Sequence, residues 1–198
     1  MKVRDTMAKR IPLADDPRLE GGSVENIVDA YQNASEVDIF EGREWYAVAN
    51  AIATGIHANG AGIMAALSPS ASWDLNVTMA REIVADRDCQ FQSWDNKKKA
   101  LRILDGEKPL DVLGGNKVRA FYKAIAGVDT EPVIDRHAFS VYLGRHSTDK
   151  NTKVITDRKG AYQLVADAYR KAAAILGVDN HTVQATTWVA WRRINGIS

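Results

Sequence analysis

Two residues of this chain, Lys117 and Asp135, have the type and local setting that covalent chemistry needs. Lys117 follows the two glycines of "LGGNK" and is expected in the first turn of a helix. The positive end of the helix dipole there disfavours a charged ammonium, and a neutral amine is a nucleophile. Taken alone, a lysine at this place is more often a solvated surface residue.

Asp135 stands directly before the amphipathic run "RHAFSVYLG". Its carboxylate can accept hydrogen bonds from backbone N–H groups two or three residues ahead, as an N-cap that contributes about 1 kcal/mol. A capped carboxylate that faces a cavity could also stabilise a developing cation or activate a water. A plain N-cap is the more common role, so the pair is more informative than either residue.

The residues before Lys117 predict a tight turn with anion-binding capacity. Gly114 and Gly115 are conformationally free, and Asn116 follows them at the expected helix start. Backbone N–H groups at such a turn can point outward and hold a phosphate oxygen. We therefore expect these three residues to contact DNA if the chain binds it.

The elements that must position these residues are all helices. Apolar residues recur at helical spacing, and no alternating run is bounded by hairpin chemistry. The pattern predicts an all-α fold of eight or nine helices, with a polar loop over 144–157. Residues 1–22 read as an N-terminal arm and residues 23–198 as a single domain. The expected helices cover 24–34, 41–58, 63–67, 72–85, about ten residues of 95–105, 115–126, 135–143, 158–176 and 180–194.

The amino-acid composition indicates which class of protein this chain belongs to. The chain has 198 residues, of which 45% are hydrophobic and 26% charged, as in an ordinary globular domain. No apolar run approaches the roughly 18 residues of a membrane span, and charges stand where a signal peptide needs an apolar core. A cytoplasmic location and no membrane contact are the expectation.

Cysteine and histidine usage predicts a chain without a metal or cofactor. Cys89 is the single cysteine, which excludes an internal disulfide and an iron–sulfur cluster held by several cysteines. The four histidines show no paired-ligand spacing.

Charge is unevenly distributed and suggests a polyanionic partner. Residues 97–159 hold 14 Lys and Arg against 8 Asp and Glu, whereas residues 1–96 hold 8 against 15. The basic segment includes the run Lys97, Lys98 and Lys99, and it surrounds the Lys–Asp pair. Phosphate contacts dominate nucleic-acid affinity, so a basic face favours DNA. A chance fluctuation of charge explains the same numbers equally well.

The spacing of the pair resembles that of the helix-hairpin-helix DNA glycosylase superfamily, which includes endonuclease III and 8-oxoguanine glycosylase. Those proteins have a Gly-rich hairpin, then Gly-x-Lys and a helix, and some 18–19 residues later a V-D-x-H motif. The chain has "GNKVRAF" followed by "VIDRHAFSVYLG". Lys117 matches the family's nucleophile, Asp135 its catalytic aspartate and His137 the histidine after it.

Other segments extend the resemblance, with departures. "AALSPSASWDLNVTMAREI" is similar to the family's "LLS-x-Q-x-x-D" segment, but Ser70 stands where the Gln that fills the gap of an extruded base is usual. Leu113 stands where the hairpin's first Gly is usual. "TVQATTWVAWRR" falls where the family has its late core helix. These departures affect the expected substrate more than the expected fold.

The resemblance implies a DNA glycosylase, with or without lyase activity. Such enzymes extrude a nucleotide and cleave its N-glycosidic bond. The lysine attacks the sugar C1′ and forms a Schiff base, while the aspartate stabilises the cationic sugar. Two alternatives stay open: a base-hypermodification enzyme on the same fold, as in some bacteriophages, and a DNA-binding module without catalysis.

The remaining candidates are assigned to two roles. Near the pair and the hairpin, contacts to DNA are expected from Arg119, Arg136, His137 and Ser70. Three residues are expected to line a base pocket by stacking or hydrogen bonding, although core packing is the more common role for such side chains. They are Trp73, Gln184 and Trp188, the last two spaced four apart on one helix face.

Overall fold

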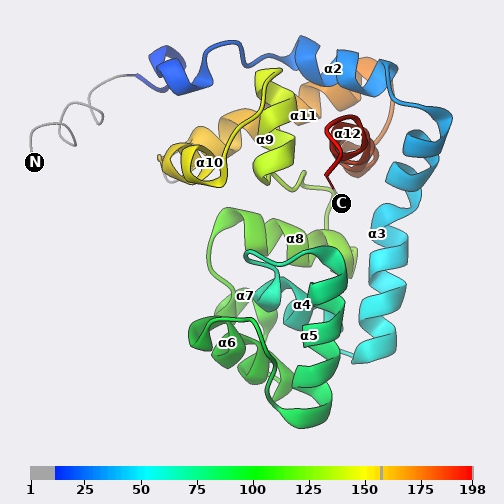
Figure 1. Cartoon of the computed structure of the whole chain (residues 1–198), viewed down its shortest axis with the longest axis vertical. Helices are drawn as coiled ribbons and strands as arrows, with labels where there is room; N and C mark the ends of the chain where they lie inside the picture. The colour runs from blue at the N-terminus through cyan, green and yellow to red at the C-terminus, as the bar shows by residue number, and fades with distance from the viewer. Residues whose placement is uncertain (1–11, 157, 198) are drawn as a thin grey trace, which may run out of the picture. The chain divides into compact units, whose positions relative to one another are not determined.

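The computed structural model describes residues 12–156 and 158–197, and all regular structure in these ranges is helical (Figure 1). The all-α prediction is confirmed. Two short 3-10 helices, Leu13–Asp15 and Pro17–Leu19, come first. The α-helices are α2 (Val24–Gln32), α3 (Glu36–Ile56), α4 (Gly60–Leu67), α5 (Trp73–Asp86), α6 (Trp94–Leu104), α7 (Pro109–Val112), α8 (Asn116–Ala126), α9 (Arg136–Leu143), α10 (Asp149–Thr156), α11 (Ala161–Leu176) and α12 (Asn180–Ile194).

Two helices, α7 and α10, were not expected. Helix α10 occupies residues 149–156 of the polar loop predicted over 144–157, and residue 157 lies outside the described residues. That loop prediction was wrong because α10 is anchored by polar contacts. Thr152 of α10 is buried, and its hydroxyl lies 2.9 Å from the hydroxyl of Ser147. Contacts between hydroxyl groups do not appear in the sequence as apolar residues at helical spacing, so the pattern did not predict this helix.

Helix α3 begins five residues before its predicted start because of a reciprocal cap. The Ser35 hydroxyl accepts a hydrogen bond from the Asp38 amide, and the Ser35 amide donates to the Asp38 carboxylate at 2.9 Å. This is the arrangement of a capping box, with Asp in place of Glu.

The described residues form two compact units, and the chain leaves the first unit and returns to it. Of the described residues, those from 12 to 42 and those after Val133 belong to the first unit, and Arg43–Val133 forms the second. The prediction of a single domain over 23–198 stays a prediction. No helix among the described residues combines the length and apolar character needed to cross a membrane.

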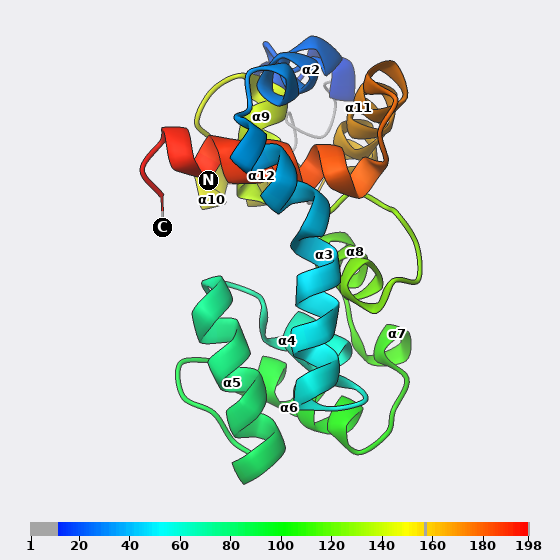
Figure 2. The same ribbon diagram turned by 90° about the vertical axis from the view of Figure 1, so that its right-hand side faces the viewer.

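In the first unit, α9 packs among α2, α11 and α12, and α2 lies against α11 and α12 (Figures 1 and 2). Every residue of α9 after Arg136 is buried. Tyr169 of α11, Phe139 of α9 and Ile27 of α2 are among the largest fully buried side chains. Because other helices enclose α9, we expect the backbone at its N-cap, Asp135, to be held rigidly.

Residues 12–22 of the predicted arm pack onto this unit, and residues 1–11 lie outside the described residues. The Asp16 carboxylate is 3% exposed and is held by the guanidinium groups of Arg18 and Arg158. These hydrogen bonds, the one from Arg18 first, hold the pKa of Asp16 well below its usual range. Further along, the Ser23 amide donates to the Tyr142 carbonyl at 3.0 Å.

The second unit is built around α4. Residues Gly62–Leu67 of α4 are all buried, as expected for a helix enclosed by others. Helices α5, α6 and α8 pack against it. Side-chain amides also tie this core together, since Asn76 donates to the Met64 carbonyl at 2.9 Å and Asn59 to the Ile103 carbonyl at 3.0 Å.

Gly42 permits the close crossing of α3 and α12 within the first unit, which generates a stability prediction. A Cβ at this position would lie 2.5 Å from the Cα of Thr186, and both helices would have to shift. We expect Gly42→Ala to lower the free energy of unfolding by about 1–3 kcal/mol, the usual cost of overpacking. Urea denaturation followed by circular dichroism measures this change.

The matched control is Gly55→Ala in the same helix. A Cβ at Gly55 meets nothing within 4 Å. This variant should gain roughly 0.5–1 kcal/mol, because alanine restricts the unfolded chain. Equal effects of the two substitutions would contradict the close crossing.

The pair of Asp38 and Arg193 generates a pH prediction. Asp38 is 1% exposed, and the Arg193 guanidinium hydrogen-bonds both its oxygens, which lowers the pKa of Asp38 from 3.8 to about 2. Because this pKa is lower in the folded state, the pair stabilises above about pH 4 and loses its effect as the pH falls toward 2. We expect Asp38→Asn to lower the urea midpoint at pH 7.

The difference between wild type and Asp38→Asn should shrink as the pH approaches 2, where Asp38 is protonated in both states. Asp95→Asn, which removes an exposed ion pair with Lys99, is the control and should change the midpoint little at either pH. A deficit of Asp38→Asn that is the same at both pH values would refute the role of the ionised carboxylate.

Candidate active site

The hairpin before Lys117 consists of α7, a three-residue connection and α8, all within the second unit. Leu113 has φ −76° and is 3% exposed, so this position accepts a side chain and anchors the connection in the core. Gly115 has φ +75°, which favours glycine, and it stands at the N-cap of α8 without a side-chain hydrogen bond. The backbone at position 113 does not require glycine, so the leucine found there in place of a glycine does not disturb it.

Lys117 lies in the first turn of α8 and is half-buried. Among the described residues its side chain takes part in no hydrogen bond or ion pair. Three other lysines of the second unit are paired: Lys97 with Asp88, Lys99 with Asp95 and Lys123 with Asp129. The Lys117 amine is therefore available to a ligand without first breaking an ion pair.

Asp135 is the N-cap of α9 in the first unit, and both of its carboxylate oxygens are engaged. Oδ1 accepts a hydrogen bond from the Ala138 amide at 2.8 Å. Oδ2 accepts one from the indole Nε1 of Trp188 at 2.9 Å. Both donors are neutral, and no cation among the described residues forms an ion pair with this carboxylate. The result is an oriented anion without a counter-ion.

Two buried tyrosines of α11 fix the backbone on either side of Asp135. The Tyr162 hydroxyl accepts a hydrogen bond from the Ile134 amide at 3.2 Å. The Tyr169 hydroxyl donates to the Ala138 carbonyl at 3.0 Å. Burial, more than any other factor, raises the pKa of Tyr169, which keeps its hydroxyl protonated as a donor. Helices α11 and α12 thus hold the start of α9 from three directions.

Trp188 is the centre of a small cluster at the start of α9. The His137 ring meets the Trp188 ring edge-on, with centroids 6.3 Å apart. The Arg192 guanidinium lies over the Trp188 ring, with Cζ 4.3 Å from its centroid. Arg136 lies beside His137, its Nη2 3.1 Å from His137 Nε2. The first unit therefore brings together four of the predicted residues: Asp135, Arg136, His137 and Trp188.

The contacts of the other predicted residues lie within their own units. Arg119 donates to the carbonyls of Leu110 and Leu113 at 2.7 and 3.0 Å, so it braces the hairpin. Gly114 and Asn116 are exposed at its tip. Gln184 is 4% exposed within α12.

Two more predicted residues, Ser70 and Trp73, belong to the second unit. Ser70 is exposed in the turn between α4 and α5, with φ +61°. Trp73 packs on Trp45 with ring centroids 5.4 Å apart and contacts the core around α4. Trp73 is thus part of the packing of its own unit.

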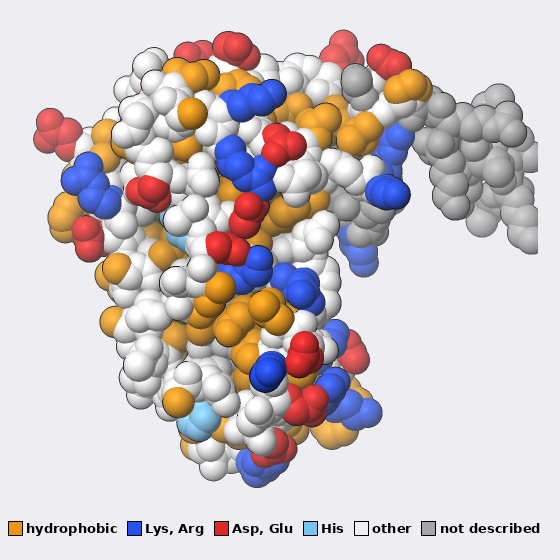
Figure 3. Space-filling view, turned by 180° about the vertical axis from the view of Figure 1, so that it is seen from behind, with side chains coloured by type: hydrophobic (Ala, Val, Ile, Leu, Met, Phe, Trp, Pro, Cys, Tyr) orange, Lys and Arg blue, Asp and Glu red, His pale blue; other side chains and the backbone are white. Residues whose placement is uncertain are grey.

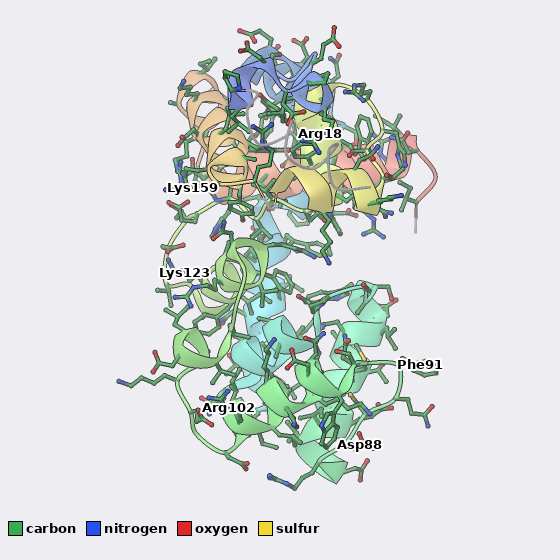
Figure 4. All side chains as sticks on the ribbon, turned by 90° about the vertical axis from the view of Figure 1, so that its left-hand side faces the viewer. Arg18, Asp88, Phe91, Arg102, Lys123 and Lys159 are labelled. Atoms are coloured by element: carbon green, nitrogen blue, oxygen red, sulfur yellow. The ribbon has the colours of Figure 1, made fainter. Side chains whose placement is uncertain are left out.

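The basic segment does not present a row of unpaired charges. Lys97, Lys99 and Arg102 each pair with a carboxylate, and Lys98 lies over the Trp94 ring at 5.4 Å. On the face drawn in Figure 3, Lys and Arg side chains are interspersed with Asp and Glu. Figure 4 labels Arg102 on α6 and Asp88 on the loop before it. Any DNA contact of the second unit therefore depends on the hairpin more than on the charge of α6.

The side chains that could bind a metal ion are dispersed over the part of the chain that the structure describes. No group of three or more His, Cys, Asp or Glu side chains there is arranged to hold a metal ion. Cys89 is buried, and burial raises the pKa of its thiol.

Three residues of the Asp135 cluster were missed by the sequence analysis: Tyr162, Tyr169 and Arg192. The tyrosines are seven residues apart, and so on one face of α11, which was a usable signal. Arg192 follows Trp188 by four residues and therefore lies on the same face of α12. Their partners are distant in sequence, so the pattern alone did not show what these residues contact.

Comparison with known proteins gives a family without an assigned activity. No curated protein and no solved structure matches the chain. A family model described as a family of unknown function (DUF7178) matches residues 11–195. Because this match covers almost the whole sequence, the chain belongs to that family.

Proposed function

We propose that this protein is a lysine-dependent DNA glycosylase, in which Lys117 is the nucleophile and Asp135 stabilises the cationic sugar. The substrate is a nucleotide of DNA that carries a modified or damaged base. Cleavage of an N-glycosidic bond proceeds through positive charge on the sugar, and a fixed anion lowers the energy of that state.

The arrangement of the Asp135 carboxylate is the observation that carries this proposal. A carboxylate that only caps a helix needs a single backbone donor, and Ala138 supplies it. The second oxygen is oriented by a hydrogen bond from the indole of Trp188, which belongs to α12. A carboxylate fixed in this way without a counter-ion is suited to meet a cation that forms only during a reaction.

The environment of Lys117 supports the same proposal. Its side chain is half-buried and unpaired among the described residues, and it follows a glycine hairpin. The N-cap of α8 offers no side-chain acceptor to the first amides of that helix. Such amides can hold a backbone phosphate while the lysine reaches the sugar.

The proposed reaction has two steps. The Lys117 amine forms a bond to C1′ as the bond from C1′ to the base breaks, and its electrons leave with the base, which takes up a proton. The nitrogen bound to C1′ gives up one proton, and its lone pair then forms a C1′=N double bond as the C1′–O4′ bond breaks. O4′ takes up a proton from water, so the product is an open sugar joined to Lys117 by a protonated Schiff base at C1′. Borohydride adds hydride to this carbon and converts it to a stable secondary amine.

The lysine assignment is tested with duplex DNA that contains an abasic site, whose aldehyde forms the Schiff base directly. Wild-type protein should be trapped on this DNA by borohydride, and Lys117→Ala should abolish the trapped species. Trapping is read as a shifted band on a denaturing gel. A panel of duplexes with modified bases then identifies the base that is released.

Lys123→Ala is the matched control, because Lys123 lies on the same helix and is paired with Asp129. Its trapping should equal that of wild type. Trapping that survives in Lys117→Ala would overturn the assignment, and absence of trapping with DNA binding retained would favour a non-catalytic binding protein.

A further inference from the structure

Arg192 is a charged residue beside the candidate site whose position is fixed by an aromatic ring. It lies in the last turn of α12, and its guanidinium Cζ is 4.3 Å from the centroid of the Trp188 ring. At this distance the cation is attracted to the π face, and a planar guanidinium can stack on it. Stacking uses the flat face and leaves the N–H groups at its edge available to an acceptor.

Arg192 differs from other arginines of the first unit in having no acceptor. Arg18 and Arg158 hold Asp16, Arg170 holds Asp167, and the neighbouring Arg193 holds Asp38. Among the described residues, the Arg192 side chain takes part in no hydrogen bond or ion pair beyond its contact with Trp188. Five N–H donors are thus held near one place without an anion.

The same indole connects Arg192 to the proposed catalytic carboxylate. Its face carries the guanidinium, and its Nε1 donates to Asp135 Oδ2 at 2.9 Å. Asp135 accepts from Ala138 and Trp188, and it forms no ion pair with Arg192. An anion bound by Arg192 would therefore be separated from Asp135 by the indole ring of Trp188.

We infer that Arg192 anchors a backbone phosphate of the DNA on which Asp135 acts. A phosphodiester presents two oxygens that match the guanidinium edge, and such pairs form two parallel charge-assisted hydrogen bonds. The inference rests on the proposed function, because it takes DNA as the ligand. It adds a phosphate contact that depends on the Trp188 platform and is separate from the hairpin before Lys117.

The test measures binding of wild type and variants to duplex DNA containing a tetrahydrofuran abasic-site analogue, which is not cleaved. Fluorescence anisotropy is recorded over a series of salt concentrations. Arg192→Met should weaken binding about tenfold, the low end for a lost hydrogen bond to a charged group. It should also reduce the slope of log affinity against log salt by about 0.9, the value for one phosphate contact.

Two further variants separate charge, geometry and location. Arg192→Lys should keep the salt slope of wild type and recover only part of the affinity, because an ammonium lacks the paired donors. Arg170→Met removes the same charge elsewhere in the unit and should leave affinity and slope close to wild type. Thermal melting by circular dichroism confirms that each variant is folded.

The inference is overturned if Arg192→Met binds with the affinity and slope of Arg170→Met, or if wild type does not bind this DNA. Borohydride trapping on an abasic site, measured in parallel, reports on the proposed function separately. Absence of trapping together with a slope that depends on Arg192 would reject the glycosylase and retain the anchor. Trapping together with a salt slope that Arg192→Met does not change would retain the glycosylase and reject the anchor.

Discussion

The Asp135 carboxylate, shared between the backbone of α9 and the indole of Trp188, is the interaction on which the candidate site depends. One oxygen satisfies an amide that the helix start leaves open, and the other meets a donor from α12. The carboxylate cannot rotate without losing one of these hydrogen bonds. Tyr162 and Tyr169 fix the backbone beside it, so its position is set by three helices of one unit.

The surrounding packing explains why this arrangement is rigid. Helix α9 is buried along almost its whole length, and Tyr169 is fully enclosed. The crossing of α3 and α12 depends on Gly42, and the end of α12 is tied to the start of α3 by Asp38 and Arg193. These contacts hold α12, and α12 carries both Trp188 and Arg192. Stability and the candidate chemistry thus depend on the same helix.

The sequence predicted the parts of this account that rest on local rules. The N-cap role of Asp135, the helix that follows it and the glycine turn before Lys117 each depend on neighbouring residues, and the structure has all three. Glycine at 115 is explained by its positive φ, and leucine at 113 by its extended backbone and burial. The functional role of the pair remains a prediction.

Long-range contacts were beyond the sequence pattern. Arg119 looked like a DNA contact, but its acceptors are carbonyls of the preceding turn. The run of Lys97, Lys98 and Lys99 looked like part of a basic patch over 97–159, but Lys97 and Lys99 each pair with a carboxylate. Helix α10 was missed because its buried contacts are polar. In each case the deciding partner is a side chain or carbonyl that periodicity does not identify.

A role of Asp135 in catalysis as well as in capping is tested by a comparison of two N-cap residues, Asp135 and Asp179. Asp179 caps α12 with the same geometry, accepting from the Thr182 amide at 2.8 Å. Asparagine can cap in place of aspartate, so Asp135→Asn and Asp179→Asn should both fold. Asp135→Asn also loses the hydrogen bond from the Trp188 indole, which is expected to lower its stability by about 1–3 kcal/mol. The measurement is the single-turnover rate of base release from the DNA that wild type cleaves. We expect Asp135→Asn alone to lower this rate about 100-fold or more, which is the effect of losing one electrostatic contact in a transition state. Equal rates for the two variants would contradict it.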